Sequence, residues 1–262
     1  MDDFLLRGGI GTASGSFSDL LTAHGALNWA ELASHSPGEI SSANATTVIS
    51  VRYSGGVLMV GDRQATEGYS VAHRNMDKVF PTDEFSAVAI SGTAGLAIEM
   101  VRLFQTELEH YEKLEGSRLS LEGKANYLAR LVRQQLPMAF QGLVVVPLFC
   151  GFERLEERGR LFTFDVVGGR YEEEDFGATG SGSREAKSYL RAHYQDDLEE
   201  SSALDVTIRS LVAAAEQDVA TGGPDLRRGI FPAVVTITAE GVVERTADEI
   251  RPYAEAAIEA SR

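Results

Sequence analysis

The sequence predicts an α+β domain in which blocks of strands alternate with blocks of helices. Alternating or continuous apolar runs typical of strands occur in three regions, 46–63, 143–167 and 233–244. Apolar stripes with helical spacing occupy the regions between them, 94–136 and 184–218. Segregated blocks of this kind are typical of sheets that are covered by helices on their outer faces.

The chain from residue 45 to residue 63 is predicted to form a β-hairpin. Thr47, Ile49, Val51 and Tyr53 fall on one face of its first strand, whereas Thr46, Val48, Ser50 and Arg52 fall on the other. Gly55 and Gly56 are expected to supply the positive φ angles of a two-residue turn. The return strand, 57–60, then brings Asp62 back to the beginning of the hairpin, close to Thr46.

Two amphipathic helices are predicted next, over 94–112 and 120–136, and Pro137 is expected to end or kink the second. Each helix has an apolar stripe that should face inward. The inward residues are expected to be Leu96, Met100, Leu103, Leu108 and Tyr111 in the first helix, and Leu121, Tyr127, Leu128, Leu131, Val132 and Leu136 in the second.

Composition excludes several classes of function. The 262 residues carry a formal net charge of −15, which argues against nucleic acid or an anionic membrane surface as a partner. Cys150 is the single cysteine, so no intrachain disulfide forms, and a cytoplasmic location is expected. The five histidines and this cysteine form no metal-binding pattern, so no metal or other cofactor is predicted.

Residues 1–45 do not have the pattern of a secretory signal, because the start is acidic and no long apolar core follows. Residues 34–45 are small, polar and unpatterned, and they run directly into the predicted strand. If the chain is cut before Thr46, the strand opens with a free α-amine beside a hydroxyl. An α-amine has a pKa of roughly 8 and therefore acts as a base toward the threonine Oγ.

Several motifs resemble those of the catalytic beta subunit of the core proteasome. They are Thr46-Thr47 at the start of a strand, Gly61-Asp62-Arg63, Lys78 and the run Ser91-Gly92-Thr93-Ala94. The segments 110–116, 180–183 and 221–226 resemble the actinobacterial version of that subunit in particular. The resemblance covers about residues 46 to 250, with the motifs in the expected order and spacing.

This resemblance implies the four-layer αββα sandwich of N-terminal nucleophile hydrolases. It implies that residues 1–45 are a propeptide, removed by self-cleavage of the Ala45–Thr46 bond, and that 46–262 form the catalytic domain. Members of the family usually carry glycine before the threonine. Ala45 departs from that pattern, and its methyl group restricts the turn that presents the scissile carbonyl, so slower self-processing is expected.

The resemblance also implies roles for individual residues. Thr46 matches the nucleophile and N-terminal base, Asp62 and Lys78 match a charged pair beside it, and the N–H of Gly92 matches the oxyanion hole. Ser181, Asp218 and Thr221 match groups that hold the amine in place. The residues that match the substrate pocket are Ala65, Thr66, Met76, Ile90, Ala94 and Ile98, and their largely apolar character predicts cleavage after hydrophobic residues.

The leading hypothesis is a threonine endopeptidase that degrades proteins with broad specificity. The partners implied are proteasome alpha subunits and other beta copies in four stacked seven-membered rings, a ring-shaped ATPase, and substrates tagged with the prokaryotic ubiquitin-like protein. Two alternatives remain open at the level of sequence: a self-processing amidohydrolase that acts on a small amide, and a structural ring subunit whose leader is never removed.

Overall fold

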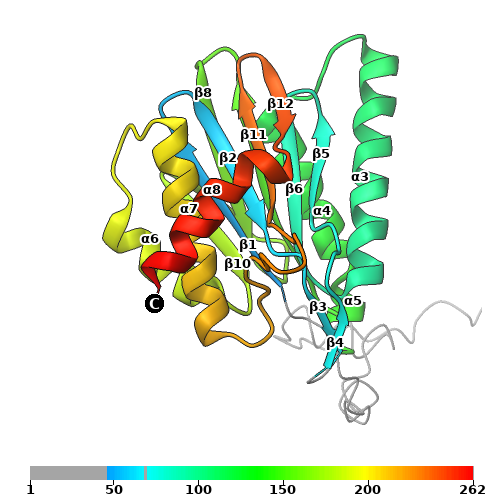
Figure 1. Cartoon of the computed structure of the whole chain (residues 1–262). Coiled ribbons are helices and arrows are strands. Elements are labelled where there is room, and N and C mark those ends of the chain that lie inside the picture. Colours follow the sequence, from blue (N-terminus) through cyan, green and yellow to red (C-terminus); the bar gives the residue numbers. More distant parts are fainter. Residues whose placement is uncertain (1–45, 68–69, 262) are drawn as a thin grey trace, which may run out of the picture. The chain divides into compact units, whose positions relative to one another are not determined.

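Two five-stranded antiparallel sheets lie face to face in the computed structural model, which describes residues 46–67 and 70–261 (Figure 1). The first sheet has the strand order β10-β1-β2-β11-β12 and the second the order β5-β6-β7-β8-β9, whereas β3 and β4 form a separate pair. The strands are β1 (Thr47–Tyr53), β2 (Gly56–Gly61), β3 (Ala65–Glu67), β4 (Ser70–His73), β5 (Val79–Asp83), β6 (Ser86–Gly92), β7 (Val145–Glu153), β8 (Arg158–Phe164), β9 (Arg170–Glu173), β10 (Phe176–Gly180), β11 (Ala233–Thr238) and β12 (Gly241–Glu244).

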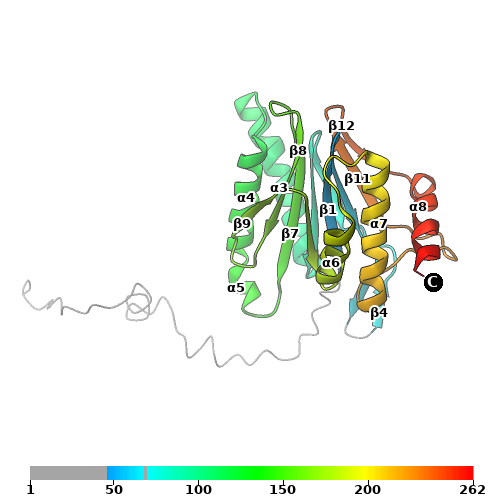
Figure 2. The same cartoon turned by 90° about the vertical axis from the view of Figure 1, so that its left-hand side faces the viewer.

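Helices cover the outer face of each sheet. In Figure 2 α3 and α4 lie outside the second sheet, and α6, α7 and α8 lie outside the first. The helices are α3 (Ala94–Glu115), α4 (Leu121–Gln134), the short α5 (Leu136–Ala139), α6 (Ser183–His193), α7 (Glu200–Gln217) and α8 (Ala247–Ala260). The predicted four-layer αββα sandwich is therefore confirmed.

Three apolar clusters fill the spaces between these layers, as the alternation of side chains along the strands requires. In β2, Leu58 and Val60 point to the helices α6–α8, whereas Val57 and Met59 belong to the cluster between the two sheets. The cluster between the second sheet and α3–α4 includes Phe104, Phe149 and Phe162. Because both faces of β2 are buried, this central strand is apolar throughout.

The opening hairpin has the expected strands, but the prediction for its turn is wrong. Tyr53 pairs with Gly56, so Ser54 and Gly55 form the loop, and neither Gly55 nor Gly56 has a positive φ. Gly56 is instead needed for close packing, because a Cβ at this position would lie 2.1 Å from the carbonyl oxygen of Ile237 in the neighbouring strand β11. The glycine permits sheet pairing rather than the turn.

The stripe predicted for the first long helix is partly wrong. Met100 and Leu108 are buried as expected, but Leu103 and Tyr111 are 44% and 37% exposed. The inward stripe instead runs through Met100, Phe104 and Leu108 at steps of four residues. Strand β10 was not predicted, because its sequence has no apolar run. It is the edge strand that pairs with β1.

Candidate active site at the start of the first strand

The hairpin of β1 and β2 brings Asp62 to the beginning of the first strand. Val48 pairs with Gly61, so the next residues along the two strands, Thr47 and Asp62, face each other. The backbone N–H of Thr47 donates to Oδ1 of Asp62 at 2.9 Å, and the N–H of Asp62 donates to the carbonyl oxygen of Thr47 at 3.1 Å. Thr46, immediately before the strand, is only 5% exposed.

Lys78 and Asp62 form an ion pair that is almost fully removed from water. The distance from Nζ of Lys78 to Oδ1 of Asp62 is 2.7 Å, and the two side chains are 4% and 0% exposed. Burial lowers the pKa of Lys78, and the Asp62 carboxylate opposes that shift. The second carboxylate oxygen accepts from the N–H groups of Gln64 and Gly222, at 3.1 and 3.0 Å, so the charge is held in one orientation.

A second group of residues approaches Thr46 from the other side. The backbone N–H of Ser181, just after β10, donates to the carbonyl oxygen of Thr46 at 3.0 Å. The hydroxyls of Ser181 and Thr221 both donate to Oδ2 of Asp218, which caps the end of α7. Ser181, just after β10, is thus joined to Asp218 and Thr221, at the end of α7 and just beyond it, through one carboxylate oxygen next to the start of β1.

Gly92 lies at the end of β6, at the junction with α3. Its φ is +117°, and a Cβ there would lie 2.0 Å from the carbonyl oxygen of Val144, so only glycine fits. The hydroxyl oxygen of the preceding residue, Ser91, lies 3.1 Å from Oγ1 of Thr179 in β10. This contact joins the end of β6 to the strand that leads to Ser181.

The residues predicted to line a substrate pocket are only partly brought together. Met76 and Ile98 line a hollow of about 320 Å³ together with Phe80 and Val101, and Asp77, Arg102 and Gln105 complete its wall. Ala65, Thr66, Ile90 and Ala94 do not line this hollow. The N–H of Met76 donates to the carbonyl oxygen of Arg63 at 2.9 Å, so the hollow borders the segment next to Asp62.

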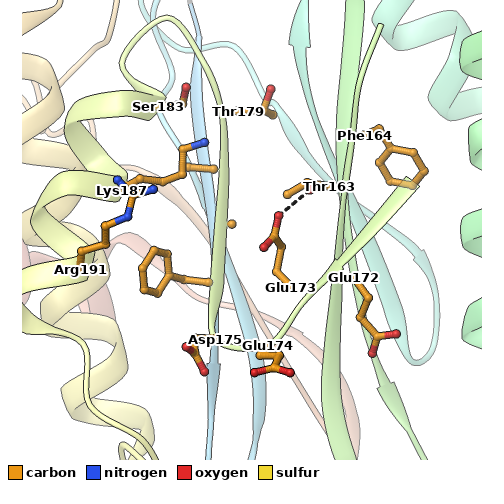
Figure 3. Close-up of a pocket in the computed structure, with 13 residues that line it drawn as sticks. Thr163, Phe164, Glu172, Glu173, Glu174, Asp175, Thr179, Ser183, Lys187 and Arg191 are labelled. Carbon is orange, nitrogen blue, oxygen red and sulfur yellow. Dashed lines mark hydrogen bonds between the residues drawn. The ribbon is translucent and has the colours of Figure 1, made fainter. Parts of the chain in front are cut away.

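A larger hollow, of about 740 Å³, opens between β8, β9, β10 and α6 (Figure 3). Lys187 and Arg191 of α6 lie on one side of it, and the acidic residues 172–175 lie on the other. None of the predicted site residues lines this hollow. Its size alone therefore does not make it the candidate active site.

Three residues in or beside the site were not singled out from the sequence. Thr47 contacts Asp62 and Thr221, Gln64 supplies a carbonyl oxygen to Lys78 Nζ, and Phe80 lines the apolar hollow. The pair of consecutive threonines at 46 and 47 could have indicated that Thr47 also belongs to the site. For Phe80 the indication was weaker: it lies two residues beyond Lys78, so in an extended segment its side chain would be on the same side of the chain as that of Lys78.

The fold and this site define a class. An αββα sandwich whose first strand begins at a buried threonine, beside a buried aspartate–lysine pair, is an N-terminal nucleophile hydrolase of the threonine peptidase type. A family model described as proteasome subunit matches residues 42–225. The chain belongs to the proteasome family.

Known relatives agree with this family and extend over most of the chain. The proteasome subunit beta of Streptomyces griseus subsp. griseus is 52% identical over 222 residues, covering 85% of this chain and 79% of the relative. The corresponding subunit of Acidimicrobium ferrooxidans is 55% identical over 196 residues, covering 75% and 72% of the two chains. That of Acidothermus cellulolyticus is 54% identical over 208 residues, covering 78% and 71%.

No helix in the described part of the chain is both long and apolar enough to cross a membrane. The same residues contain no group of three or more histidine, cysteine, aspartate or glutamate side chains that could hold a metal ion. Cys150 is fully buried between the sheets, and burial raises the pKa of its thiol to about 12. A thiol in this state is a packing group and not a nucleophile.

Proposed function

We propose that the chain is a self-processing threonine endopeptidase, in which Thr46 becomes the N-terminal nucleophile of a proteasome core particle. One observation carries the proposal: hydrogen bonds with two of the predicted site residues, Ser181 and Asp62, fix the backbone on either side of Thr46. Its carbonyl oxygen accepts from the N–H of Ser181, and the next N–H along the chain donates to Asp62. A nucleophile that must attack in one direction requires such a fixed backbone.

In the proposed reaction the freed α-amine of Thr46 takes the proton from its own Oγ, which attacks the peptide carbonyl. The Lys78 ammonium, held by Asp62, stabilises the negative charge that develops on Oγ and favours the neutral form of the amine. The N–H of Gly92 holds the oxyanion. The amine then gives its proton to the leaving nitrogen and activates the water that hydrolyses the acyl-enzyme.

The contacts of Thr47 favour residue 46 over residue 47 as the nucleophile. The hydroxyl oxygen of Thr47 lies 2.6 Å from that of Thr221 and accepts the backbone N–H of Gly182 at 3.0 Å, and the residue is completely buried. A hydroxyl that is occupied in this way has no access to a substrate carbonyl. Cleavage after residue 45 therefore leaves the reactive hydroxyl at the new terminus.

Self-cleavage would act on the Ala45–Thr46 bond and release residues 1–45 as a propeptide. Ala45 lies outside the described residues. The apolar hollow that contains Met76 and Ile98 supports cleavage after hydrophobic residues, and broad specificity follows from a wall that offers mostly non-directional contacts. The same proposal includes Ala65, Thr66, Ile90 and Ala94 as further substrate-binding residues.

Relatives named as proteasome beta subunits support assembly with alpha subunits and other beta copies into a core particle. The proposal extends this to four stacked seven-membered rings, to a ring-shaped ATPase that delivers substrates tagged with the prokaryotic ubiquitin-like protein, and to a cytoplasmic location.

N-terminal sequencing and intact mass of the beta chain from an assembled, peptidase-active particle test the proposal. We expect a chain that begins at Thr46 and that has lost tryptophan fluorescence, because the only tryptophan of the sequence is Trp29. A Thr46→Ala variant should retain residues 1–45 and show no peptidase activity. An active particle whose beta chain still carries Trp29, or whose Thr46→Ala variant turns over normally, would contradict the proposal.

A further inference from the structure

The side chain of Thr47 is buried and hydrogen-bonded within the site, but the proposed reaction gives it no role. The residue is completely buried, and its hydroxyl oxygen has two partners, the backbone N–H of Gly182 and the hydroxyl of Thr221. Its backbone N–H is bound to Asp62 as well. Thr47 therefore contacts both Asp62, the partner of Lys78, and Thr221, the partner of Asp218.

The direction of the hydrogen bonds follows from the number of protons available. A hydroxyl carries one proton, and the hydroxyl of Thr221 uses its proton on the carboxylate of Asp218, which only accepts. The hydroxyl of Thr47 must therefore donate to Thr221, while it accepts from the N–H of Gly182. The protons point in one direction, from Gly182 through Thr47 and Thr221 to Asp218.

Two glycines allow the backbone to come close enough for this chain of hydrogen bonds to form. A Cβ on Gly182 would lie 2.7 Å from both the Thr47 and the Thr221 hydroxyl oxygens. Gly180, opposite Thr47 in β10, has a φ of +105°, and a Cβ there would lie 1.8 Å from the carbonyl oxygen of Thr46. The backbone thus approaches the start of β1 too closely for any residue larger than glycine.

We propose that Thr47 is a positioning residue, whose hydroxyl fixes the start of β1 to Asp218 and so sets where the amine and Oγ of Thr46 lie. The inference rests on the proposed role of Thr46 as the N-terminal nucleophile. Thr47 does not touch the substrate in this account. Its loss displaces the reacting groups of the neighbouring residue without removing any of them.

The test compares Thr47→Val, which keeps the shape of the side chain and removes the hydroxyl, with Thr47→Ser, which keeps the hydroxyl. Both are measured in assembled alpha–beta particles with a fluorogenic peptide. We expect Thr47→Val to lower kcat by roughly 10- to 100-fold, because displacements of about 1 Å have effects of this order, with KM changed by less than about twofold. Thr47→Ser should restore kcat to within about threefold of the parent.

Thr207→Val is the matched control. Thr207 is also completely buried, and its hydroxyl donates to the carbonyl oxygen of Ala203 within α7. This variant loses an equivalent buried hydroxyl away from the site, so its kcat should equal that of the parent. A Thr47→Val particle with parental kcat, one in which only KM rises, or a Thr47→Ser particle as slow as Thr47→Val would overturn the inference.

A second measurement applies if the Thr47→Val chain fails to remove residues 1–45. If intact mass shows that Thr47→Val retains residues 1–45, the rate of self-cleavage replaces kcat as the readout, and Thr47→Ser must again restore it. A Thr46→Ala particle distinguishes the two proposals. If it is inactive while Thr47→Val is normal, only the positioning role fails, whereas an active Thr46→Ala particle removes the proposed function itself.

Discussion

Nζ of Lys78 lies 2.7 Å from Oδ1 of Asp62, and both side chains are almost completely buried. Taking an ammonium and a carboxylate out of water is unfavourable unless they remain paired. The same Oδ1 also accepts the N–H of Thr47. Asp62 therefore binds both the Lys78 ammonium, which is proposed to stabilise negative charge on Oγ of Thr46, and the backbone that positions Thr46.

We expect Asp62→Asn and Lys78→Met each to lower kcat/KM for a fluorogenic peptide by about 10²- to 10⁴-fold, the range typical of groups that assist proton transfer. Lys78→Arg should not restore activity, because a planar guanidinium does not fit the space of a compact ammonium. Asp248→Asn is the control, since the Asp248 side chain lies on α8, is 91% exposed and pairs with Arg251. A Lys78→Met particle that is correctly assembled and keeps more than about a tenth of the parental activity would contradict this role.

Gly92→Ala tests the junction of β6 and α3. The new methyl group would lie 2.0 Å from the carbonyl oxygen of Val144 at a φ of +117°, so the backbone must shift. We expect a lower Tm, from strain of about 1–3 kcal/mol, and a loss of about 10²-fold in kcat as the proposed oxyanion N–H moves.

Gly95→Ala is the matched control, three residues away in the first turn of α3. A Cβ at Gly95 meets nothing within 4 Å, and alanine is more stable than glycine in a helix by roughly 0.5–1 kcal/mol. Its Tm should be unchanged or higher, with parental activity. Equal losses in the two variants would show that the effect is general to this helix end.

The elements with a strongly periodic apolar pattern could be predicted from the sequence. The alternation from Thr47 to Tyr53 predicted β1 and the two faces on which its side chains lie, and the chain reversal placed Asp62 beside the strand start. Strand β10 was not predicted because Gly177 and Gly180 depress strand propensity. Its glycines are explained only by tertiary packing, since a Cβ on Gly177 would lie 2.8 Å from Thr163.

Lys124 shows a second limit of sequence reasoning. It lies on the inward stripe of α4, where the pattern from Leu121 to Leu136 was interpreted from its apolar residues alone, and it is only 3% exposed. Its partner, Asp83, is the last residue of β5. Because nothing in a single sequence pairs two positions 41 residues apart, a buried lysine of this kind is found only in the fold.

The pair of Lys124 and Asp83 predicts a pH dependence of stability. Burial raises the pKa of Asp83, but the ion pair with Lys124 and hydrogen bonds from Ser86 and Phe85 outweigh it, so the pKa lies below its ordinary value of 3.8. A carboxyl with a lowered pKa in the folded state contributes stability above its unfolded pKa and loses it as the pH falls through the folded pKa. We therefore expect the free energy of unfolding to fall below about pH 4, and to do so less steeply in Asp83→Asn.

The same pair should be sensitive to the loss of one partner. Lys124→Met leaves the Asp83 carboxylate unpaired at 14% exposure and should lower the free energy of unfolding at pH 7 by about 3–5 kcal/mol. The double variant Asp83→Asn with Lys124→Met should recover part of that loss. Lys113→Met, which breaks a surface pair with Glu109, should leave the free energy of unfolding nearly unchanged. Equal effects of the two lysine variants would disprove the buried pair's contribution.

The hollow that contains Met76, Phe80 and Ile98 predicts how substrate preference can be changed. Ile98→Lys would add a cation to the wall of this hollow, which already holds the charged residues Arg102 and Asp77. We expect cleavage after glutamate to gain on cleavage after leucine by roughly 10- to 100-fold in the ratio of kcat/KM values, because specificity is a difference between transition-state affinities. The measurement is a pair of peptides that differ only in the residue before the scissile bond.

Leu103→Lys separates a local effect from a change in overall charge. Leu103 is on the same helix as Ile98, is 44% exposed and does not line the hollow. Both variants add one positive charge to α3, but only Ile98→Lys places it where the side chain before the scissile bond is proposed to bind. If the two variants change the ratio equally, the hollow is not the specificity pocket and long-range electrostatics explain the result.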